Sequence, residues 1–329
     1  MYNLFIFFLI FLFSLSIQAK EKLVIYTYDS FISEWGPGPH IKQTFEERND
    51  VEIEFFGSES AATLLAKLLL EGKSTKADIV LGLDMNLMQD AIDSKLFEKH
   101  SIENIYKHLD IPINWENDFF VPYNYGYFAF VYNNKKIKKT PKSMAELIND
   151  SNLTIVIQDP RTSTPGLGLL TWIKSLYKND AQKNWKKLNN KVVAVTKGWT
   201  DSYYNIFLSG EADMVLSYTT SPAAHIMYED NYDYSALIFD EGNYLSIEYS
   251  GILKNSQNKI LANKFLEYTL SRDFQSVIPK TNIMYPVIKI ENLPKAYEKI
   301  IKPKKTIQLN PSLIKDEKNK WINEWLNAL

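Results

Sequence analysis

Cysteine is absent from this chain of 329 residues. Without a thiol the chain forms no disulfide, builds no thiolate metal site and offers no cysteine nucleophile. A lipid-anchored exported protein of the bacterial type needs a cysteine at its cleavage site, so that class is excluded too. The histidines are few, and His40, His100, His108 and His225 have no paired spacing that indicates a shared metal site.

The common catalytic and nucleotide-binding motifs are also missing. The sequence contains no G-x-S-x-G elbow, no Walker motif and no G-x-G-x-x-G loop. A formal net charge of −2 gives no basic excess with which to bind nucleic acid. We therefore expect no cofactor, no metal, no nucleic-acid partner and no enzymatic activity.

Long apolar runs are absent after residue 19. The first residues, MYNLFIFFLIFLFSLSIQA, carry no charged side chain, are apolar from Leu4 to Leu15 and end in Ala19. This pattern is typical of an export signal, residues 1–19, that is cleaved after Ala19. It predicts a periplasmic protein. The alternative is an uncleaved membrane anchor, because the only positive charge before the apolar run is the amino terminus.

The rest of the chain has a globular composition, with 45% hydrophobic and 23% charged residues. Its length suffices for two packed lobes. Short strands alternate with helices, which is typical of an α/β fold with parallel strands. The predicted strands cover 23–28, 77–84, 153–159, 192–199 and 212–222, and the predicted helices cover 61–70, 166–178, 181–189, 201–209, a segment from 259 and 314–329.

Two further strands, 125–134 and 244–253, each separate two α/β groups. They are too regular to be linkers, so we predict that they are hinge strands between two lobes with a ligand cleft between them. One lobe would combine 20–124 with 249–329, and the other would be 125–248. The alternative is two sequential domains.

Aromatic and acidic side chains gather at the ends of the predicted strands. Tyr28 and Asp29 follow the first strand, Trp199 ends the strand 192–199, and Tyr218 precedes Ser221. The ends of parallel strands face the crevice in which open α/β sheets bind ligands. Aromatic faces attract organic cations by roughly 0.5–2 kcal/mol each. These positions therefore favour a site for a positively charged ring.

Hydroxyl side chains precede several predicted helices. In RTSTPG, residues 161–166, we predict Thr164 as the helix cap and Pro165 as the first helical residue. Ser60 and Ser221 also stand before helices. Helix N-termini favour anionic or neutral polar groups. Aromatic rings and helix ends together favour a ligand with a flat cationic ring and an oxygen-rich or phosphorylated tail.

Several motifs closely resemble those of the periplasmic thiamine-binding proteins of bacterial ABC transporters, which are type II periplasmic binding proteins. The motifs are YTYDSF, EWGPGP, EGKSTKADIVLGLD, VPYNYGYFAFVYNN, QDPRTSTPGLGLLTW, VTKGW, LSYTTSP and MYPV. The resemblance covers nearly the whole mature chain. It implies two hinged lobes that close on thiamine, its monophosphate or its diphosphate. It also implies that the protein delivers the ligand to an inner-membrane permease, through which the ATPase of the transporter is a further partner. We expect the binding protein itself to be a monomer.

The resemblance also implies a set of ligand-binding residues. They are Tyr28, Asp29, Ser60, Ala61, Ser163, Thr164, Trp199, Tyr218, Thr219, Thr220 and Ser221. We expect Trp199 and Tyr218 to sandwich or edge the thiazolium ring and Asp29 to offset its charge or bond the aminopyrimidine. We expect Ser163 and Thr164, with backbone N–H groups, to hold the hydroxyethyl or phosphate oxygens.

This chain departs from the family pattern at two places. The family often has an acidic residue and a glycine where this chain has Ser60 and Ala61, and it tends to have aromatic residues where this chain has Ala224 and Ile283. These differences concern the affinity and the preference among phosphate forms. They leave the ligand class unchanged.

Other functions remain open at this stage. Ferric-ion binders of the same fold use adjacent tyrosines, and Tyr203 and Tyr204 are adjacent here. A binder of polyamines or another organic cation is a further alternative. A thiamine-degrading enzyme of similar fold attacks its substrate with a cysteine, which this chain lacks.

Overall fold

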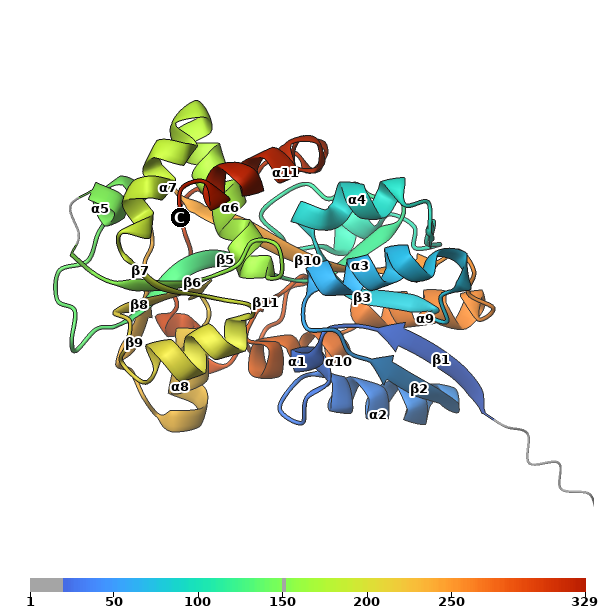
Figure 1. Cartoon of the computed structure of the whole chain (residues 1–329). Coiled ribbons are helices and arrows are strands. Elements are labelled where there is room, and N and C mark those ends of the chain that lie inside the picture. The colour runs from blue at the N-terminus through green and yellow to red at the C-terminus, as the bar shows by residue number, and fades with distance from the viewer. Residues whose placement is uncertain (1–19, 150–151) are drawn as a thin grey trace, which may run out of the picture.

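A computed structural model describes residues 20–149 and 152–329 of the chain (Figure 1). The predicted export signal, residues 1–19, lies outside the described residues. Within the described ranges, we find no helix whose length and hydropathy would let it span a bilayer.

The strands form one mixed sheet in the order β2-β1-β3-β10-β5-β8-β6-β7. Strands β1, β2 and β3 are parallel, as are β6, β7 and β8. Strands β10 and β5 run antiparallel to each other, β10 is antiparallel to β3, and β5 is antiparallel to β8. The strands are β1 (Glu21–Tyr26), β2 (Val51–Phe56), β3 (Ile79–Asp84), β4 (Phe97–Glu98), β5 (Phe120–Asn133), β6 (Ile155–Gln158), β7 (Val192–Thr196), β8 (Met214–Tyr218), β9 (Tyr234–Ala236), β10 (Asn243–Leu253), β11 (Tyr285–Pro286) and β12 (Thr306–Ile307).

Helices cover the sheet and confirm the predicted α/β class (Figure 1). The α-helices are α1 (Asp29–Ile32), α2 (Gly38–Asn49), α3 (Ala61–Glu71), α4 (Met88–Asp93), α5 (Met144–Asn149), α6 (Thr164–Tyr177), α7 (Ala181–Asn189), α8 (Pro222–Glu229), α9 (Lys259–Thr269), α10 (Arg272–Gln275) and α11 (Pro311–Leu326). Two π-helical segments are η5 (Asp201–Phe207) and η6 (Ile278–Asn282). The 3-10 turns are η1 (Gly72–Ser74), η2 (Met85–Leu87), η3 (Ile105–His108), η4 (Lys178–Asp180) and η7 (Lys295–Lys299).

Strand β5 connects two groups of elements that lie side by side in Figure 1. One group contains β1, β2 and β3, and the other contains β6, β7 and β8. Its first half pairs with β10, where Tyr125 faces Ile247, and its second half pairs with β8, where Phe128 faces Tyr218. The chain passes from one group to the other along β5 and returns along β10. This is the arrangement that the predicted hinge strands require, and their role as hinges stays a prediction.

The C-terminal helix α11 contacts both groups of elements. Lys174 on α6 forms an ion pair with Glu324 at 2.8 Å, and Lys318 forms an ion pair with Asp90 on α4 at 2.6 Å. The predicted lobe boundaries place 249–329 with 20–124, so α11 would reach across to the second lobe. Those boundaries stay a prediction.

Local sequence explains why two of these helices form where they do. Helix α3 buries Leu64 and Leu68 on one face, and its start is closed by a capping box between Ser60 and Thr63. Helix α6 approaches β5 closely at Gly168, where an added Cβ would come within 2.0 Å of the Phe128 ring. A glycine is therefore required at this contact.

Some sequence predictions were wrong in detail. Asp29 and Ser30 begin helix α1 instead of forming a turn, and the helix expected over 201–209 is the π-helix η5. The strand expected over 192–199 ends at Thr196, so Trp199 lies beyond the strand and not at its last residue. Strand β2 and helix α2 were not predicted.

Candidate ligand-binding site

A cavity of about 560 Å³ lies between the two groups of elements. Its size is within the range typical of small-molecule sites. The predicted site residues that line it are Tyr28, Ser60, Ala61, Ser163, Thr164, Trp199, Tyr218 and Ser221. Ala224 and Ile283, where this chain lacks the aromatic residues typical of the family, line it as well. The structure thus brings together residues that are far apart in the sequence.

Trp199 is held on the cavity wall by defined contacts. Its indole Nε1 donates to Ser217 Oγ at 2.8 Å, and Ser217 Oγ lies 2.7 Å from Ser221 Oγ. The indole ring packs against Tyr203 with centroids 4.8 Å apart and against the edge of Tyr204 at 5.7 Å. One function of Ser221 is therefore to fix the position of this ring.

Helix α6 points its N-terminus toward the cavity, but its cap differs from the prediction. Ser163 is the N-cap residue, Thr164 is already helical and Pro165 is the second helical residue. The Ser163 side chain makes no capping hydrogen bond. The first N–H groups of the helix thus have no side-chain acceptor at the cap, which suits them to hold a polar group of a ligand.

Ser60 lines the cavity and is also the N-cap residue of helix α3. Its Oγ accepts from the Thr63 N–H at 3.3 Å, and its own N–H donates to Thr63 Oγ1 at 2.9 Å. The hydroxyl is therefore engaged within α3.

Three predicted residues do not line the cavity. Asp29 is exposed in the first turn of α1, and its carboxylate lies against Gly57. Thr219 and Thr220 are buried behind the wall, and neither side-chain oxygen has a hydrogen-bond partner within the described residues. The charge expected from Asp29 is thus absent from the wall.

Glu248, a buried acid on the cavity wall, is not among the residues that the sequence motifs predicted. Its Oε2 accepts hydrogen bonds from Tyr28 Oη at 2.9 Å, Tyr123 Oη at 2.7 Å and Asn124 Nδ2 at 2.7 Å. Burial raises the pKa of Glu248, and these hydrogen bonds oppose the rise. Burial and the charge of Glu248 also raise the pKa of Tyr28, so its hydroxyl stays protonated and donates.

A hydrogen-bonded chain also reaches the cavity from helix α8. Tyr203 Oη lies 3.0 Å from His225 Nε2, and His225 Nδ1 lies 2.9 Å from Glu229 Oε2. Burial raises the pKa of Tyr203 well above its ordinary value. This hydroxyl is engaged and hard to ionise, which disfavours Tyr203 as the phenolate ligand of a ferric ion. In the described ranges, no cluster of His, Asp and Glu side chains is suited to a metal ion.

Two contacts cross the rim of the cavity. Glu59, before α3, forms an ion pair with Lys197, after β7, at 2.9 Å. Tyr228 Oη on α8 donates to the carbonyl of Lys280 in η6 at 2.5 Å. Each contact joins the two groups of elements, so the structure represents a closed arrangement of the rim.

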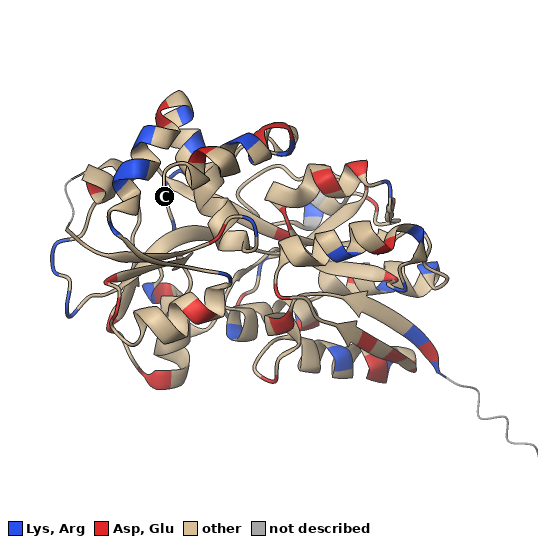
Figure 2. Ribbon diagram, in the orientation of Figure 1, with Lys and Arg blue, Asp and Glu red and all other residues tan. Residues whose placement is uncertain are grey.

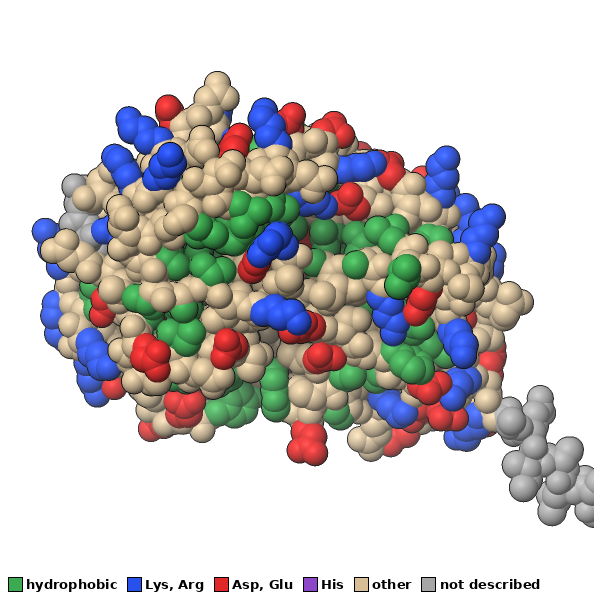
Figure 3. Space-filling model, viewed as in Figure 1, with side chains coloured by type: hydrophobic (Ala, Val, Ile, Leu, Met, Phe, Trp, Pro, Cys, Tyr) green, Lys and Arg blue, Asp and Glu red, His purple; other side chains and the backbone are tan. Residues whose placement is uncertain are grey.

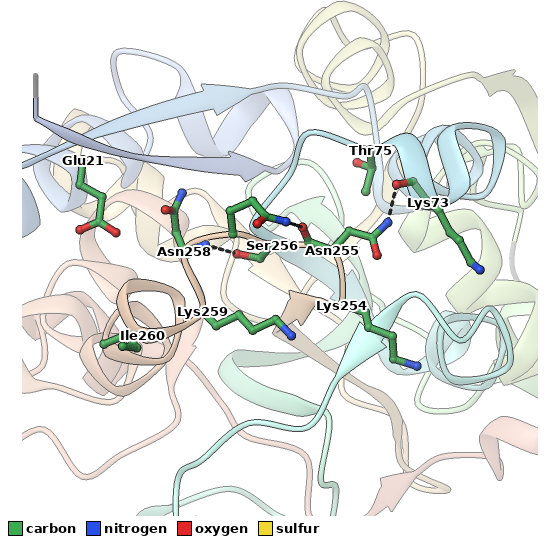
Figure 4. Close-up of a pocket in the computed structure, with 10 residues that line it drawn as sticks. Glu21, Lys73, Thr75, Lys254, Asn255, Ser256, Asn258, Lys259 and Ile260 are labelled. Atoms are coloured by element: carbon green, nitrogen blue, oxygen red, sulfur yellow. Dashed lines mark hydrogen bonds between the residues drawn. The ribbon is translucent and has the colours of Figure 1, made fainter.

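A larger hollow, of about 840 Å³, lies at the opposite end of β1 (Figure 4). Glu21, Lys73, Lys254 and Lys259 are among the residues that line it, and none of the lining residues is aromatic. Ser256 Oγ accepts from the Asn258 N–H at 3.0 Å within the same loop. This hollow lacks the aromatic rings that a flat organic ligand needs, so we place the candidate site in the smaller cavity.

The surface carries charges of both signs. Figure 2 shows Lys and Arg as well as Asp and Glu on both groups of elements. Figure 3 shows the two signs interspersed over the same face, without a wide area of one sign. This distribution agrees with the formal net charge of −2.

Comparison with known proteins agrees with the sequence motifs. Residues 74–310 match the family described as bacterial extracellular solute-binding protein. The chain is 46% identical to the thiamine-binding periplasmic protein of Salmonella typhimurium, with 94% of each chain covered. It is 48% identical to the protein of that name from Brucella melitensis, with 94% of this chain and 93% of the relative covered.

Solved structures place the fold in the same group. A periplasmic thiamin binding protein superposes with a TM-score of 0.90 at 46% identity, covering 94% of this chain and 96% of that one. Iron-bound HitA from Pseudomonas aeruginosa superposes with a TM-score of 0.77 at 17% identity, covering 94% and 99%. The second match shows the fold alone. The predicted two-lobed fold of the type II periplasmic binding proteins is confirmed.

These relatives are named as binding proteins and not as enzymes, which agrees with the prediction that the chain is not an enzyme. The similarity extends over nearly the whole chain. The chain belongs to the bacterial extracellular solute-binding protein family and, within it, to the family of thiamine-binding periplasmic proteins.

Proposed function

We propose that this chain is the thiamine-binding component of an ABC importer and that thiamine binds in the cavity between the two groups of elements. The observation that carries the proposal is the joint position of Trp199 and Tyr218 on one cavity wall, beside the buried acid Glu248. Aromatic faces and a carboxylate are the groups that stabilise a cationic ring. The names of the relatives point to the same ligand.

The thiazolium would lie against Trp199 and Tyr218, and the hydroxyethyl group would reach the N-terminus of α6 at Ser163 and Thr164. The mono- and diphosphate esters would place their phosphate oxygens at the same helix end. Asp29, Thr219 and Thr220 would act from outside the wall, by supporting the residues that form it.

The protein would act as a periplasmic monomer after removal of residues 1–19 behind Ala19. Ligand binding would favour the closed arrangement of the two lobes over an open one. The permease would then recognise the closed form and pass the ligand inward, with its ATPase supplying the energy.

Isothermal titration calorimetry of the purified mature chain tests the proposal. Thiamine and its two phosphate esters should bind with one site per chain, whereas spermidine should not bind. Tight binding of spermidine without binding of thiamine would favour the organic-cation alternative. A visible phenolate-to-iron absorption band on addition of Fe(III) would favour the ferric alternative.

Two further measurements complete the test. Mass spectrometry of the protein as purified should detect co-isolated thiamine or an ester. Incubation with thiamine should yield no free pyrimidine, and the appearance of pyrimidine products would instead indicate an enzyme.

A further inference from the structure

Tyr228, in the last turn of helix α8, presents an exposed aromatic ring at the rim of the cavity. The residue is 65% exposed and yet lines the cavity. Its Oη donates to the carbonyl of Lys280 in η6 at 2.5 Å. A tyrosine whose hydroxyl is bonded and whose ring remains open to solvent is suited to bind a ligand, because the apolar face is free and already oriented.

Helix α8, which carries Tyr228, is anchored in the group that contains β8. His225 on this helix is buried, and its ring stacks on that of Tyr234 with centroids 4.1 Å apart. Tyr234 begins strand β9, which pairs with the same half of β5 as β8 does. The donor side of the hydrogen bond therefore moves with the group of β6, β7 and β8.

Segment η6, which carries the acceptor Lys280, is anchored in the other group. Ile278 in η6 is fully buried and belongs to the same core as Ile25 of β1. Asn282 Oδ1, at the end of η6, lies 3.2 Å from Tyr28 Oη, just after β1. The bond from Tyr228 therefore joins the two groups of elements across the rim, and it exists only while the groups are together.

The other contact across the rim is of a weaker kind. Glu59 and Lys197 form an ion pair at 2.9 Å, and both side chains are exposed. Solvent and salt screen such a pair, so it contributes little at physiological ionic strength. The hydrogen bond of Tyr228 joins neutral groups and is not weakened in this way. Of these two contacts, it is the one suited to hold the rim closed.

The ring of Tyr228 stands one helical turn from a small residue on the cavity wall. Ala224 precedes it by four positions on α8, so the two side chains lie on the same face of the helix. Both line the cavity. Ala224 offers a ligand a single methyl group, whereas Tyr228 offers an aromatic face beside it. A flat ligand held between the two groups would therefore be covered by Tyr228 from the side of α8.

We infer that Tyr228 covers the bound ligand and holds the two groups closed through its hydrogen bond to Lys280, and that it thereby sets the rate at which the ligand leaves. The inference rests on the proposed function and adds a residue that controls release. The bond stabilises the closed form and is absent from the open form that the ligand first meets. Its loss should therefore raise the dissociation rate constant and leave the association rate constant unchanged.

A purely local role for Tyr228 makes a different prediction. In that case the ring would only shield the end of α8, and the bond to Lys280 would be a surface contact without effect on the ligand. Removal of the hydroxyl would then change neither rate constant. Two variants separate the roles, because Tyr228→Phe removes the hydroxyl and keeps the ring, whereas Tyr228→Ala removes both.

The experiment measures both rate constants for thiamine at pH 7 and physiological ionic strength. Stopped-flow tryptophan fluorescence gives the association rate constant, since Trp35 and Trp199 line the cavity. Calorimetry gives the dissociation constant, and the product of the two is the dissociation rate constant. Tyr232→Phe and Tyr232→Ala are the matched controls, because Tyr232 is an exposed tyrosine just beyond α8 that does not line the cavity. Circular dichroism establishes that each variant is folded.

A neutral hydrogen bond changes an equilibrium constant by roughly twofold to twelvefold. Tyr228→Phe should therefore raise the dissociation rate constant by about threefold or more, and Tyr228→Ala by about tenfold or more. The association rate constant should stay within about twofold of the wild type, and the Tyr232 variants should change neither.

Three results would overturn the inference. The first is an unchanged dissociation rate constant in Tyr228→Phe. The second is a loss of affinity that comes from slower association. The third is a Tyr228→Ala variant that releases thiamine no faster than Tyr228→Phe, since the ring would then cover nothing. If Tyr228→Ala does not fold, Tyr228→Phe decides, because it keeps the packing of the ring. If the wild type does not bind thiamine, the proposed function itself fails, which is a different result from binding with unchanged rates in the variants.

Discussion

Replacement of Trp199 by alanine removes the aromatic face that we expect to contact the thiazolium. The indole is fixed by its hydrogen bond to Ser217 at 2.8 Å and by the Tyr203 ring 4.8 Å behind it. The ring is therefore held in one orientation before the ligand arrives. A preorganised ring loses little entropy on binding, so most of its contact energy contributes to affinity.

The expected loss follows from the cost of removing the ring. Truncation of an aromatic side chain at a binding hot spot costs about 2 kcal/mol or more, and this cost already includes the roughly 0.5–2 kcal/mol by which the aromatic face stabilises a cation. Because about 1.4 kcal/mol corresponds to a tenfold change, Trp199→Ala should weaken thiamine binding by roughly one to two decades.

Calorimetry with thiamine measures this loss directly. Trp199→Phe keeps an aromatic face and should lose much less affinity than Trp199→Ala. Circular dichroism should show that both variants are folded, since Trp199 lies on the cavity wall outside the main core. An affinity of Trp199→Ala equal to that of the wild type would refute the placement of the cationic ring against Trp199.

Three further predictions test the site and the fold. Combined Ser163→Ala and Thr164→Ala should weaken the phosphate esters more than thiamine in calorimetry, and equal losses would reject the phosphate role of this helix end. Gly168→Ala should destabilise the fold by about 1–3 kcal/mol in urea unfolding, because the new methyl group meets Phe128. Burial raises the pKa of Asp84 from 3.8 to about 6. The ionised carboxylate therefore lowers the free energy of unfolding of the ligand-free protein above pH 6, and this destabilisation disappears below about pH 4, where the carboxyl is protonated in both the folded and the unfolded state. Asp84→Asn should therefore stabilise the ligand-free protein by up to about 3 kcal/mol at pH 7 and by little at pH 4, and a gain that is independent of pH would contradict this origin.

Local patterns predicted many of the elements and much of the cavity wall, although strand β2 and helix α2 were not predicted. Helix α3 has apolar residues at helical spacing after the cap Ser60, and both signals lie within a dozen residues. Trp199 and Tyr218 were recognised because they lie near the ends of strands, where α/β folds bind ligands.

Glu248 could not be found in the same way. In the stretch YLSIEYSGIL a single acid within a strand equally fits a solvent-exposed position. Its burial depends on Tyr28 and Tyr123, which are more than a hundred residues away in the sequence. Asp29 was chosen instead because it follows a predicted strand, whereas helix α1 turns its carboxylate toward Gly57.

The most direct test of the proposed thiamine site is a crystal structure of the mature protein grown with thiamine. We expect electron density for the vitamin in the interlobe cavity, with the thiazolium within about 6 Å of the Trp199 ring, Tyr218 on the same wall and Glu248 as the nearest carboxylate. A vacant cavity with Trp199 and Tyr218 far apart, or thiamine bound elsewhere on the chain, would contradict it.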